Sequence, residues 1–190
     1  MKEVLIVSGH PNMDEESFSN RIILECLTHL LPEANTLRLD RAHHHYEFDI
    51  GLEQERLKKA DIIVFQFPMF WYGLPALMKK YIDDVFAHGF AYGSTGTYLK
   101  DKTLLVSFTT GGAEADYRYD GEQRYPVEDF LPFLKNLAWY CGMHWGGMVY
   151  SGGLMFLPGQ DESIIQEMKR KAEDHARTLA DNVMRLNLSA

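Results

Sequence analysis

Ile62-Ile63-Val64-Phe65 is an unbroken apolar run, and it carries the strongest structural signal in the chain. Two similar blocks lie on either side of it, Val4-Leu5-Ile6-Val7 and Leu104-Leu105-Val106. Continuous rather than alternating apolarity is typical of strands that are covered on both faces, as in a parallel sheet. Five strands are expected along the chain: Glu3–Ser8, Asn35–Leu39, Asp61–Phe67, Thr103–Thr109 and Gly147–Tyr150.

Helical patterns alternate with these strands. A short helix is expected around Leu52–Lys59, and four longer segments carry one apolar stripe each at helical spacing. The stripes are Ile22, Ile23, Cys26, Leu27 and Leu30; Leu74, Leu77, Met78, Tyr81, Ile82, Val85 and Phe86; Phe130, Phe133, Leu134, Leu137 and Ala138; and Ile165, Met168, Ala172, Leu179, Val183 and Leu186. Alternating strands and helices without a linker or repeat predict a single α/β domain over residues 1–190, with a doubly wound parallel sheet.

Bulk composition excludes several functions. The net charge is −8 and the chain has no basic block, so neutralisation of nucleic-acid phosphates is not expected. No apolar run reaches the roughly 18–20 residues that span a bilayer, and the N-terminus lacks the layout of a signal peptide. We therefore expect a cytoplasmic protein, in which the only cysteines, Cys26 and Cys141, are buried and reduced.

In an open α/β sheet, ligands bind beyond the carboxyl ends of the strands. The loop at Gly9–Asn20 follows the first strand there, and Ser17 is placed to cap the next helix. Free N–H groups at a helix start bind phosphate, although this loop has neither dinucleotide-binding nor Walker A spacing. An ordinary helix cap is the alternative, and the acids Asp14–Glu16 oppose an anion unless they point outward.

Two further loops at the same edge are unusual. Phe70-Trp71-Tyr72 follows the third strand, and bulky rings on a loop are costly unless a ligand, a neighbouring helix or a dimer partner covers them. Thr109-Thr110-Gly111-Gly112 follows the fourth strand, where glycines permit close approach of the backbone to a ligand or form a simple turn. An anion cradle, an aromatic shelf and a donor loop together describe flavin mononucleotide (FMN).

The sequence resembles the flavodoxin-like NAD(P)H:quinone oxidoreductase family over nearly its whole length. The motifs that carry the resemblance are Ser8–Pro11, Ser17–Ser19, Gln66–Pro68, Trp71–Lys79, Gly89–Tyr92 and Thr109–Gly112. Arg124–Asp129 and Cys141–Trp145 are similar to a short bacterial branch. That branch contains general stress protein 14-like reductases and ancillary proteins of glutathione-regulated potassium-efflux systems. The resemblance implies a five-stranded sheet of order 2-1-3-4-5 with helices on both faces.

The resemblance also implies roles for individual residues. The flavin phosphate and ribityl chain would be held by His10, Ser17, Phe18 and Ser19. The ring would be lined by Pro68, Met69, Phe70, Trp71 and Tyr72, and its edge would be hydrogen-bonded by Thr110, Gly111 and Gly112. Tyr117 would be the catalytic residue near the pyrimidine end. A histidine follows this tyrosine in the quinone reductases, whereas this chain has Asp120-Gly121-Glu122-Gln123-Arg124.

The implied activity is hydride transfer from NAD(P)H to FMN, or to FAD as the alternative, and then to a quinone-like acceptor. The rival function is a regulatory, flavin-bearing ancillary subunit of a potassium-efflux transporter, at the inner face of the membrane through that partner. A homodimer is implied as well, with Phe48, Phe90 and Tyr92 as candidate contacts.

Three consecutive histidines, His43–His45, do not indicate a metal site. Adjacent residues point in divergent directions, and the usual ligand spacing is absent. With Tyr46 and Phe48 beside them, they are interpreted as a lid or a dimer contact.

Overall fold

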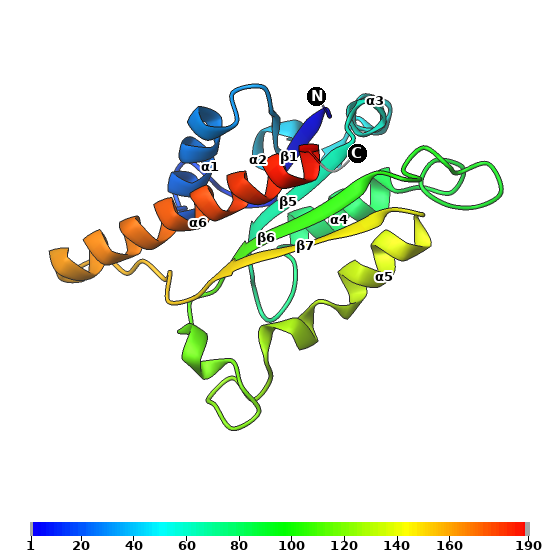
Figure 1. Cartoon of the computed structure of the whole chain (residues 1–190). Coiled ribbons are helices and arrows are strands. Elements are labelled where there is room, and N and C mark those ends of the chain that lie inside the picture. The colour runs from blue at the N-terminus through cyan, green and yellow to red at the C-terminus, as the bar shows by residue number, and fades with distance from the viewer. Residues whose placement is uncertain (1, 189–190) are drawn as a thin grey trace.

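Five parallel strands form the central sheet of the computed structural model, which describes residues 2–188 (Figure 1). They are β1 (Val4–Ser8), β2 (Asn35–Arg38), β5 (Ile62–Pro68), β6 (Thr103–Thr109) and β7 (His144–Ser151). The strands lie in the order β2-β1-β5-β6-β7. Ranked along the chain, this is the order 2-1-3-4-5 that the family resemblance implies, so the expected topology is confirmed.

The apolar run at Ile62 forms the middle strand. Every residue of β5 is buried, and Val64 pairs with Ile6 of β1 on one side and with Leu105 of β6 on the other. Successive side chains point to opposite faces of a strand. A central strand covered on both faces therefore needs an apolar residue at each position, which explains the continuous rather than alternating pattern.

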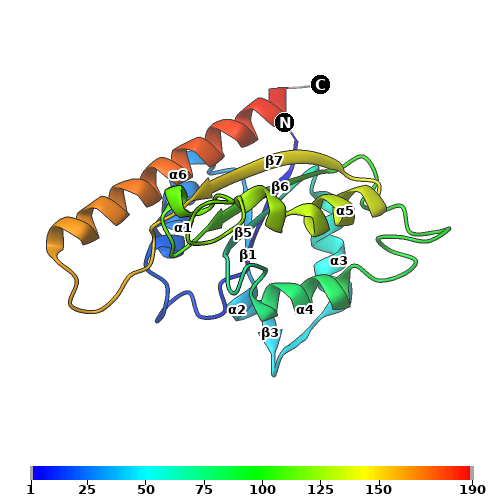
Figure 2. The same ribbon diagram turned by 90° about the horizontal axis from the view of Figure 1, so that it is seen from below.

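Two layers of helices cover the sheet (Figures 1 and 2). One face is covered by α1 (Ser19–Leu30) and α6 (Glu162–Leu188), which pack with Ile6 and Val64. The other is covered by α3 (Ile50–Lys59), α4 (Ala76–Val85) and α5 (Pro132–Tyr140), which pack with Leu5 and Phe65. The shorter elements are helix α2 (Leu39–Ala42), the hairpin strands β3 (His43–His44) and β4 (Glu47–Phe48), and the 3-10 helices η1 (Glu114–Asp116) and η2 (Val127–Phe130).

The expected apolar stripes are wrong at two positions. Leu30 and Phe133 are exposed, because Leu24 and Leu134 supply the buried contacts of α1 and α5. Phe130 precedes α5, in η2. Leu39 begins α2 rather than ending a strand. Cys141 is buried as expected, but Cys26 is only half-buried.

The structure also corrects the candidate dimer contacts. Phe48 and Phe90 are buried within the chain's own core, where the Phe48 ring lies edge-on to Tyr81 and Phe90 stacks on Tyr98. Tyr92 is half-buried and packs against the same core. The buried rings of Phe48 and Phe90 cannot form a contact surface, whereas Tyr92 keeps part of its surface exposed.

Residues 2–188 contain no helix that combines the length and the apolarity required to cross a membrane. In the same part of the chain, no three metal-ligating side chains are gathered, and the His43–His45 segment forms one strand and the turn of a small hairpin.

Candidate functional site

A cleft of about 240 Å³ lies at the carboxyl edge of the sheet, where the loops after β1, β5, β6 and β7 meet. Most of the predicted cofactor-binding residues line it, namely His10, Ser17, Phe18, Ser19, Pro68, Met69, Phe70, Thr110 and Gly111. The other predicted residues, Trp71, Tyr72, Gly112 and Tyr117, lie outside this lining.

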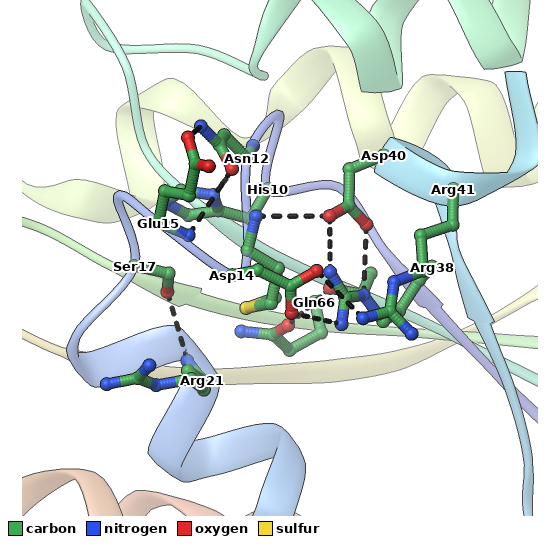
Figure 3. A network of polar contacts seen from close by, with 12 residues as sticks. His10, Asn12, Asp14, Glu15, Ser17, Arg21, Arg38, Asp40, Arg41 and Gln66 are labelled. Atoms are coloured by element: carbon green, nitrogen blue, oxygen red, sulfur yellow. Dashed lines mark hydrogen bonds and ion pairs between the residues drawn. The ribbon is translucent and has the colours of Figure 1, made fainter. Parts of the chain in front are cut away.

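One end of the cleft is an anion cradle at the start of α1. The hydroxyl of Ser17 accepts a hydrogen bond from the backbone N–H of Arg21 at 3.0 Å (Figure 3). Ser17 thus satisfies a donor in the first turn of α1, as expected of a cap, but the N-cap position itself is Phe18. The backbone N–H groups of Ser17, Phe18, Ser19 and Asn20 have no acceptor among residues 2–188. Four unpaired donors at the positive end of a helix form a site for a phosphate-like group.

His10 adds a neutral donor beside this cradle. Its Nδ1 accepts a hydrogen bond from the backbone N–H of Asn12 at 3.1 Å, which leaves the ring proton on Nε2. Burial lowers the pKa of His10 below its usual value, against the opposing charge of Asp40. The imidazole is therefore a neutral N–H donor at neutral pH.

Of the three acids of this loop, Asp14 is held by two arginines. Asp14 accepts hydrogen bonds from Arg38 and Arg41, both at 2.8 Å, and Asp40 pairs with Arg38 as well (Figure 3). These two guanidinium groups hold the pKa of Asp14 far below its usual range. Glu16 is the one acid that lines the cleft.

The aromatic shelf is a tight turn. Phe70 and Gly73 exchange two backbone hydrogen bonds of 3.1 Å, and Trp71 and Tyr72 between them have left-handed φ angles of 46° and 63°. This turn directs Phe70 to the cleft, where its ring lies edge-on to His10 at 6.2 Å. The Trp71 side chain is 94% exposed. Of the three aromatic residues of the shelf, Phe70 therefore lines the cleft, whereas Trp71 and Tyr72 lie outside it.

Thr110 begins the glycine loop but contributes no free backbone donor. Its N–H donates to the carbonyl oxygen of Ser151 at 3.1 Å, so the hydrogen bond from Thr110 to a ring edge that the resemblance implies cannot come from this N–H. Its hydroxyl donates to the carbonyl oxygen of Gly112 and also contacts the Tyr150 hydroxyl at 3.1 Å. Burial raises the pKa of Tyr150 to about 12, so this hydroxyl stays protonated.

The remaining two N–H groups of the glycine loop are free, whereas two carbonyl groups of the loop accept hydrogen bonds. The N–H groups of Gly153 and Leu154 donate to Gly112 and Thr110, at 2.7 and 3.0 Å. Within the described chain, the N–H groups of Gly111 and Gly112 have no acceptor. The glycine loop is thus a ledge of two donors, Gly111 lining the cleft and its neighbour Gly112 outside that lining, which suits a ligand edge rich in acceptors.

The loop after β7 supplies cleft residues that the sequence analysis missed. Phe156 stacks on Phe18 with ring centroids 4.8 Å apart, and the hydroxyl of Ser19 donates to the carbonyl oxygen of Leu154. Met155 lies against Gly111, where an added Cβ would come within 2.5 Å of the Met155 Cε atom. The signal available was an apolar run after Gly152-Gly153, directly beyond the last strand.

Asn20 was missed as well. A buried polar chain beneath the cleft runs from Ser8 to Gln66, from Gln66 to Asn20 at 2.5 Å, and from Asn20 to Thr109 at 3.0 Å. Buried amides are stable when their hydrogen bonds are satisfied. This chain therefore fixes the ends of β1, β5 and β6 relative to α1.

Tyr117 stands on an outer wall rather than in the cleft. Its ring lies edge-on to Phe130 at 6.4 Å, and Phe130 stacks on Tyr72 at 5.2 Å. An added Cβ on Gly112 would be 3.3 Å from the Tyr117 ring, so this wall touches the glycine loop. Tyr72 also donates a hydrogen bond to the side-chain oxygen of Gln123 at 3.1 Å.

The sheet order and a ligand cleft at its carboxyl edge define a flavodoxin-like protein. The chain belongs to that family, because the family model described as Flavodoxin-like fold matches residues 2–176.

Known proteins resemble it in sequence and structure. The chain is 39% identical over 145 residues to the glutathione-regulated potassium-efflux system ancillary protein KefG of Escherichia coli O1:K1, covering 75% of this chain and 77% of that protein. The structure of general stress protein 14 of Treponema denticola in complex with FMN has a TM-score of 0.83 and 27% identity, covering 95% of this chain and 99% of that one. The NAD(P)H:quinone oxidoreductase of Methanothermobacter marburgensis has a TM-score of 0.69 and 24% identity, covering 94% and 96%, and shows a shared fold.

Proposed function

We propose that this protein binds FMN in the cleft and catalyses NAD(P)H-dependent, two-electron reduction of quinone-like acceptors. The observation that carries the proposal is a pair of unpaired donor sets at one cleft, the cradle at Ser17–Asn20 within its lining and the ledge that Gly111 begins there and Gly112 continues. The likeness to a general stress protein 14 in complex with FMN supports the same cofactor.

The residues present fit such a cofactor. The cradle suits the phosphate, with the neutral N–H of His10 beside it. Pro68, Met69 and Phe70 offer an apolar surface for a flat ring, and the free N–H groups of the ledge suit its carbonyl edge. FMN, when bound, supplies the hydride chemistry, and the protein supplies position and electrostatics.

The chain's own groups favour negative charge at the ledge. Fixed N–H dipoles need no reorganisation when charge develops, so they stabilise a negatively charged ring edge more than a neutral one. Tyr117, beside Gly112, is the residue we propose to contact substrate at this end. Its hydroxyl lies 3.5 Å from where a Gly112 Cβ would be.

A ligand series tests the cradle directly. FMN should bind the apo-protein much more tightly than riboflavin, which has the same ring without the phosphate, and FAD binding should show whether the longer cofactor is accepted. Fluorescence quenching measures all three affinities, and the visible spectrum with NAD(P)H measures reduction. Equal binding of FMN and riboflavin would exclude the phosphate role of the cradle. A colourless protein that takes up no flavin would exclude the function.

A second function, regulation of a potassium-efflux transporter, is favoured by the 39% identity to an ancillary protein of such a system. We propose that the protein acts in the cytoplasm, at the inner face of the membrane when its transporter partner binds it. Co-purification with the transporter tests this, and regulation should survive a variant that binds flavin but does not turn over. Loss of regulation together with turnover would show that regulation requires catalysis, and a wild-type protein that neither co-purifies with nor regulates the transporter would favour the enzyme alone.

We also propose a homodimer whose contacts come from exposed aromatic residues rather than from the buried Phe48 and Phe90. Trp71 is the foremost candidate, because a ring that is 94% exposed on a rigid turn is costly in water. Gel filtration with light scattering tests this, comparing wild type with Trp71→Ala. A wild-type protein that is monomeric and fully active would contradict it.

A further inference from the structure

The side chain of Gln123 bridges the aromatic turn and the glycine ledge. It lies on the loop between η1 and η2, which projects beyond the carboxyl edge of the sheet (Figure 1). Its backbone is fixed, because its N–H donates to Asp116 at 3.0 Å and its carbonyl oxygen accepts from Tyr125 at 2.8 Å. The side-chain oxygen accepts the hydroxyl of Tyr72 at 3.1 Å.

This arrangement orients the amide nitrogen. A carboxamide is planar, so an oxygen held by Tyr72 leaves Nε2 facing elsewhere, and an added Cβ on Gly112 would lie 3.3 Å from that nitrogen. In the described part of the chain, Nε2 of Gln123 donates to no acceptor. Because Gly112 has no side chain, nothing on this residue separates its backbone from the Gln123 amide, which therefore lies directly over the ledge.

Three sources of donors therefore meet at Gly112: its own N–H with that of Gly111, the Tyr117 hydroxyl, and Nε2 of Gln123. Gly112, Tyr117 and Gln123 are half-buried, and unpaired donors that are partly buried cost free energy unless a ligand or water accepts from them. The ligand that fits has several acceptor atoms along one edge, such as the imide edge of a flavin ring.

We propose that Gln123 is a binding residue of this site, whose amide donates a hydrogen bond to the acceptor edge of the bound flavin, and that Tyr72 is the positioning residue that orients this amide. The inference rests on the proposed flavin function. An amide has no titratable proton, so Gln123 favours the more negative, reduced ring without exchanging a proton with it.

The test measures the affinity of the apo-protein for FMN and the two-electron midpoint potential of the holoprotein, for wild type, Gln123→Met and Tyr72→Phe. Methionine keeps the length of the side chain without its amide, and phenylalanine keeps the ring stacked on Phe130. Glu122→Gln, at an exposed neighbouring position, and Tyr125→Phe are the matched controls. Circular dichroism verifies that each variant is folded.

Gln123→Met should weaken the preference for reduced over oxidised FMN about tenfold, which makes the midpoint potential about 30 mV more negative. Tyr72→Phe should shift the potential in the same direction by less. The double variant should be no worse than Gln123→Met, because Tyr72 acts through the amide. A purely structural residue would weaken both redox forms equally.

Unchanged potentials in Gln123→Met, in a wild-type protein that binds FMN, would overturn this inference and leave the proposed function intact. Additive effects of the two substitutions would overturn the positioning role of Tyr72. A wild-type protein that binds no FMN would overturn both proposals.

Discussion

The backbone N–H of Met13 donates a hydrogen bond to Oδ2 of Asp40 at 3.1 Å, joining the loop after β1 to helix α2. The other carboxylate oxygen of Asp40 accepts from Nε of Arg38 at 3.1 Å. Burial alone would raise the pKa of Asp40, but the hydrogen bonds from Arg38 and Met13 outweigh it and lower the pKa. The charged carboxylate thus clamps the loop that carries the anion cradle.

Replacing Asp40 should loosen that loop. Asp40→Ala leaves the Met13 N–H unpaired and the Arg38 guanidinium with only Asp14, so we expect a loss of about 1–3 kcal/mol of unfolding free energy and weaker FMN binding. Urea unfolding and fluorescence titration measure the two effects. The control is Asp83→Ala, which breaks an exposed pair with Lys79 on α4 and should cost under about 0.5 kcal/mol. Equal losses in both variants would contradict the clamp.

His175 should make stability depend on pH. It is 2% exposed, it contacts the hydroxyls of Ser107 at 2.8 Å and Ser151 at 2.9 Å, and burial lowers its pKa to about 4. The unfolded chain takes up a proton near pH 6.5 and the folded chain only near pH 4, so stability falls as the pH falls between these values. The loss from pH 7 to pH 5 should be about 2 kcal/mol, at about 1.4 kcal/mol per pKa unit.

Urea unfolding of wild type and His175→Gln at both pH values measures that effect. The variant should be less stable at pH 7, because the hydroxyls lose a partner, but it should lack this part of the pH dependence. Identical pH dependence in the two proteins would show that His175 does not titrate on unfolding.

Alanine should destabilise the protein at one glycine, Gly9, and be tolerated at another, Gly73. A Cβ on Gly9 would lie 2.8 Å from Sδ and 2.9 Å from Cβ of Met78, so Gly9→Ala should cost about 1–3 kcal/mol through overpacking. Gly73→Ala should be tolerated, because nothing lies within 4 Å of the added atom. Thermal unfolding of both variants is the measurement, and a stable Gly9→Ala protein would contradict the tight packing of β1 on α4.

Trp71 should be dispensable for folding. Its side chain is 94% exposed and its φ angle is 46°, a conformation that costs about 1 kcal/mol or more in a residue with a side chain. Trp71→Gly relieves this cost and loosens the unfolded chain, so we expect unchanged or slightly raised stability. Trp71→Ala keeps the strain and should match wild type. Loss of a dimer contact would lower stability only in a concentration-dependent way, so urea unfolding is measured at several protein concentrations. A marked loss of stability in either variant that does not depend on concentration would show that the ring supports the fold.

The fold class was predictable from the sequence because the short apolar runs at Val4, Ile62 and Leu104 are typical of strands buried on both faces, and helical stripes separate them. Stripe spacing alone could not fix helix rotation, so Leu30 and Phe133 were placed in the core. These two side chains are exposed because other residues of the same helices, Leu24 and Leu134, face the core, and the rotation of each helix is decided by packing in three dimensions.

The sequence by itself determined that a cradle, an aromatic turn and a glycine loop follow strands that end at one edge, since parallel strands place their carboxyl ends together. Only the tertiary structure decided which of their donors are free. The Thr110 N–H is taken by Ser151, Asp14 is held by Arg38 and Arg41, and Gln123 reaches Tyr72. Hydrogen bonds between residues far apart in the chain depend on distances of a few tenths of an ångström, which no local pattern encodes.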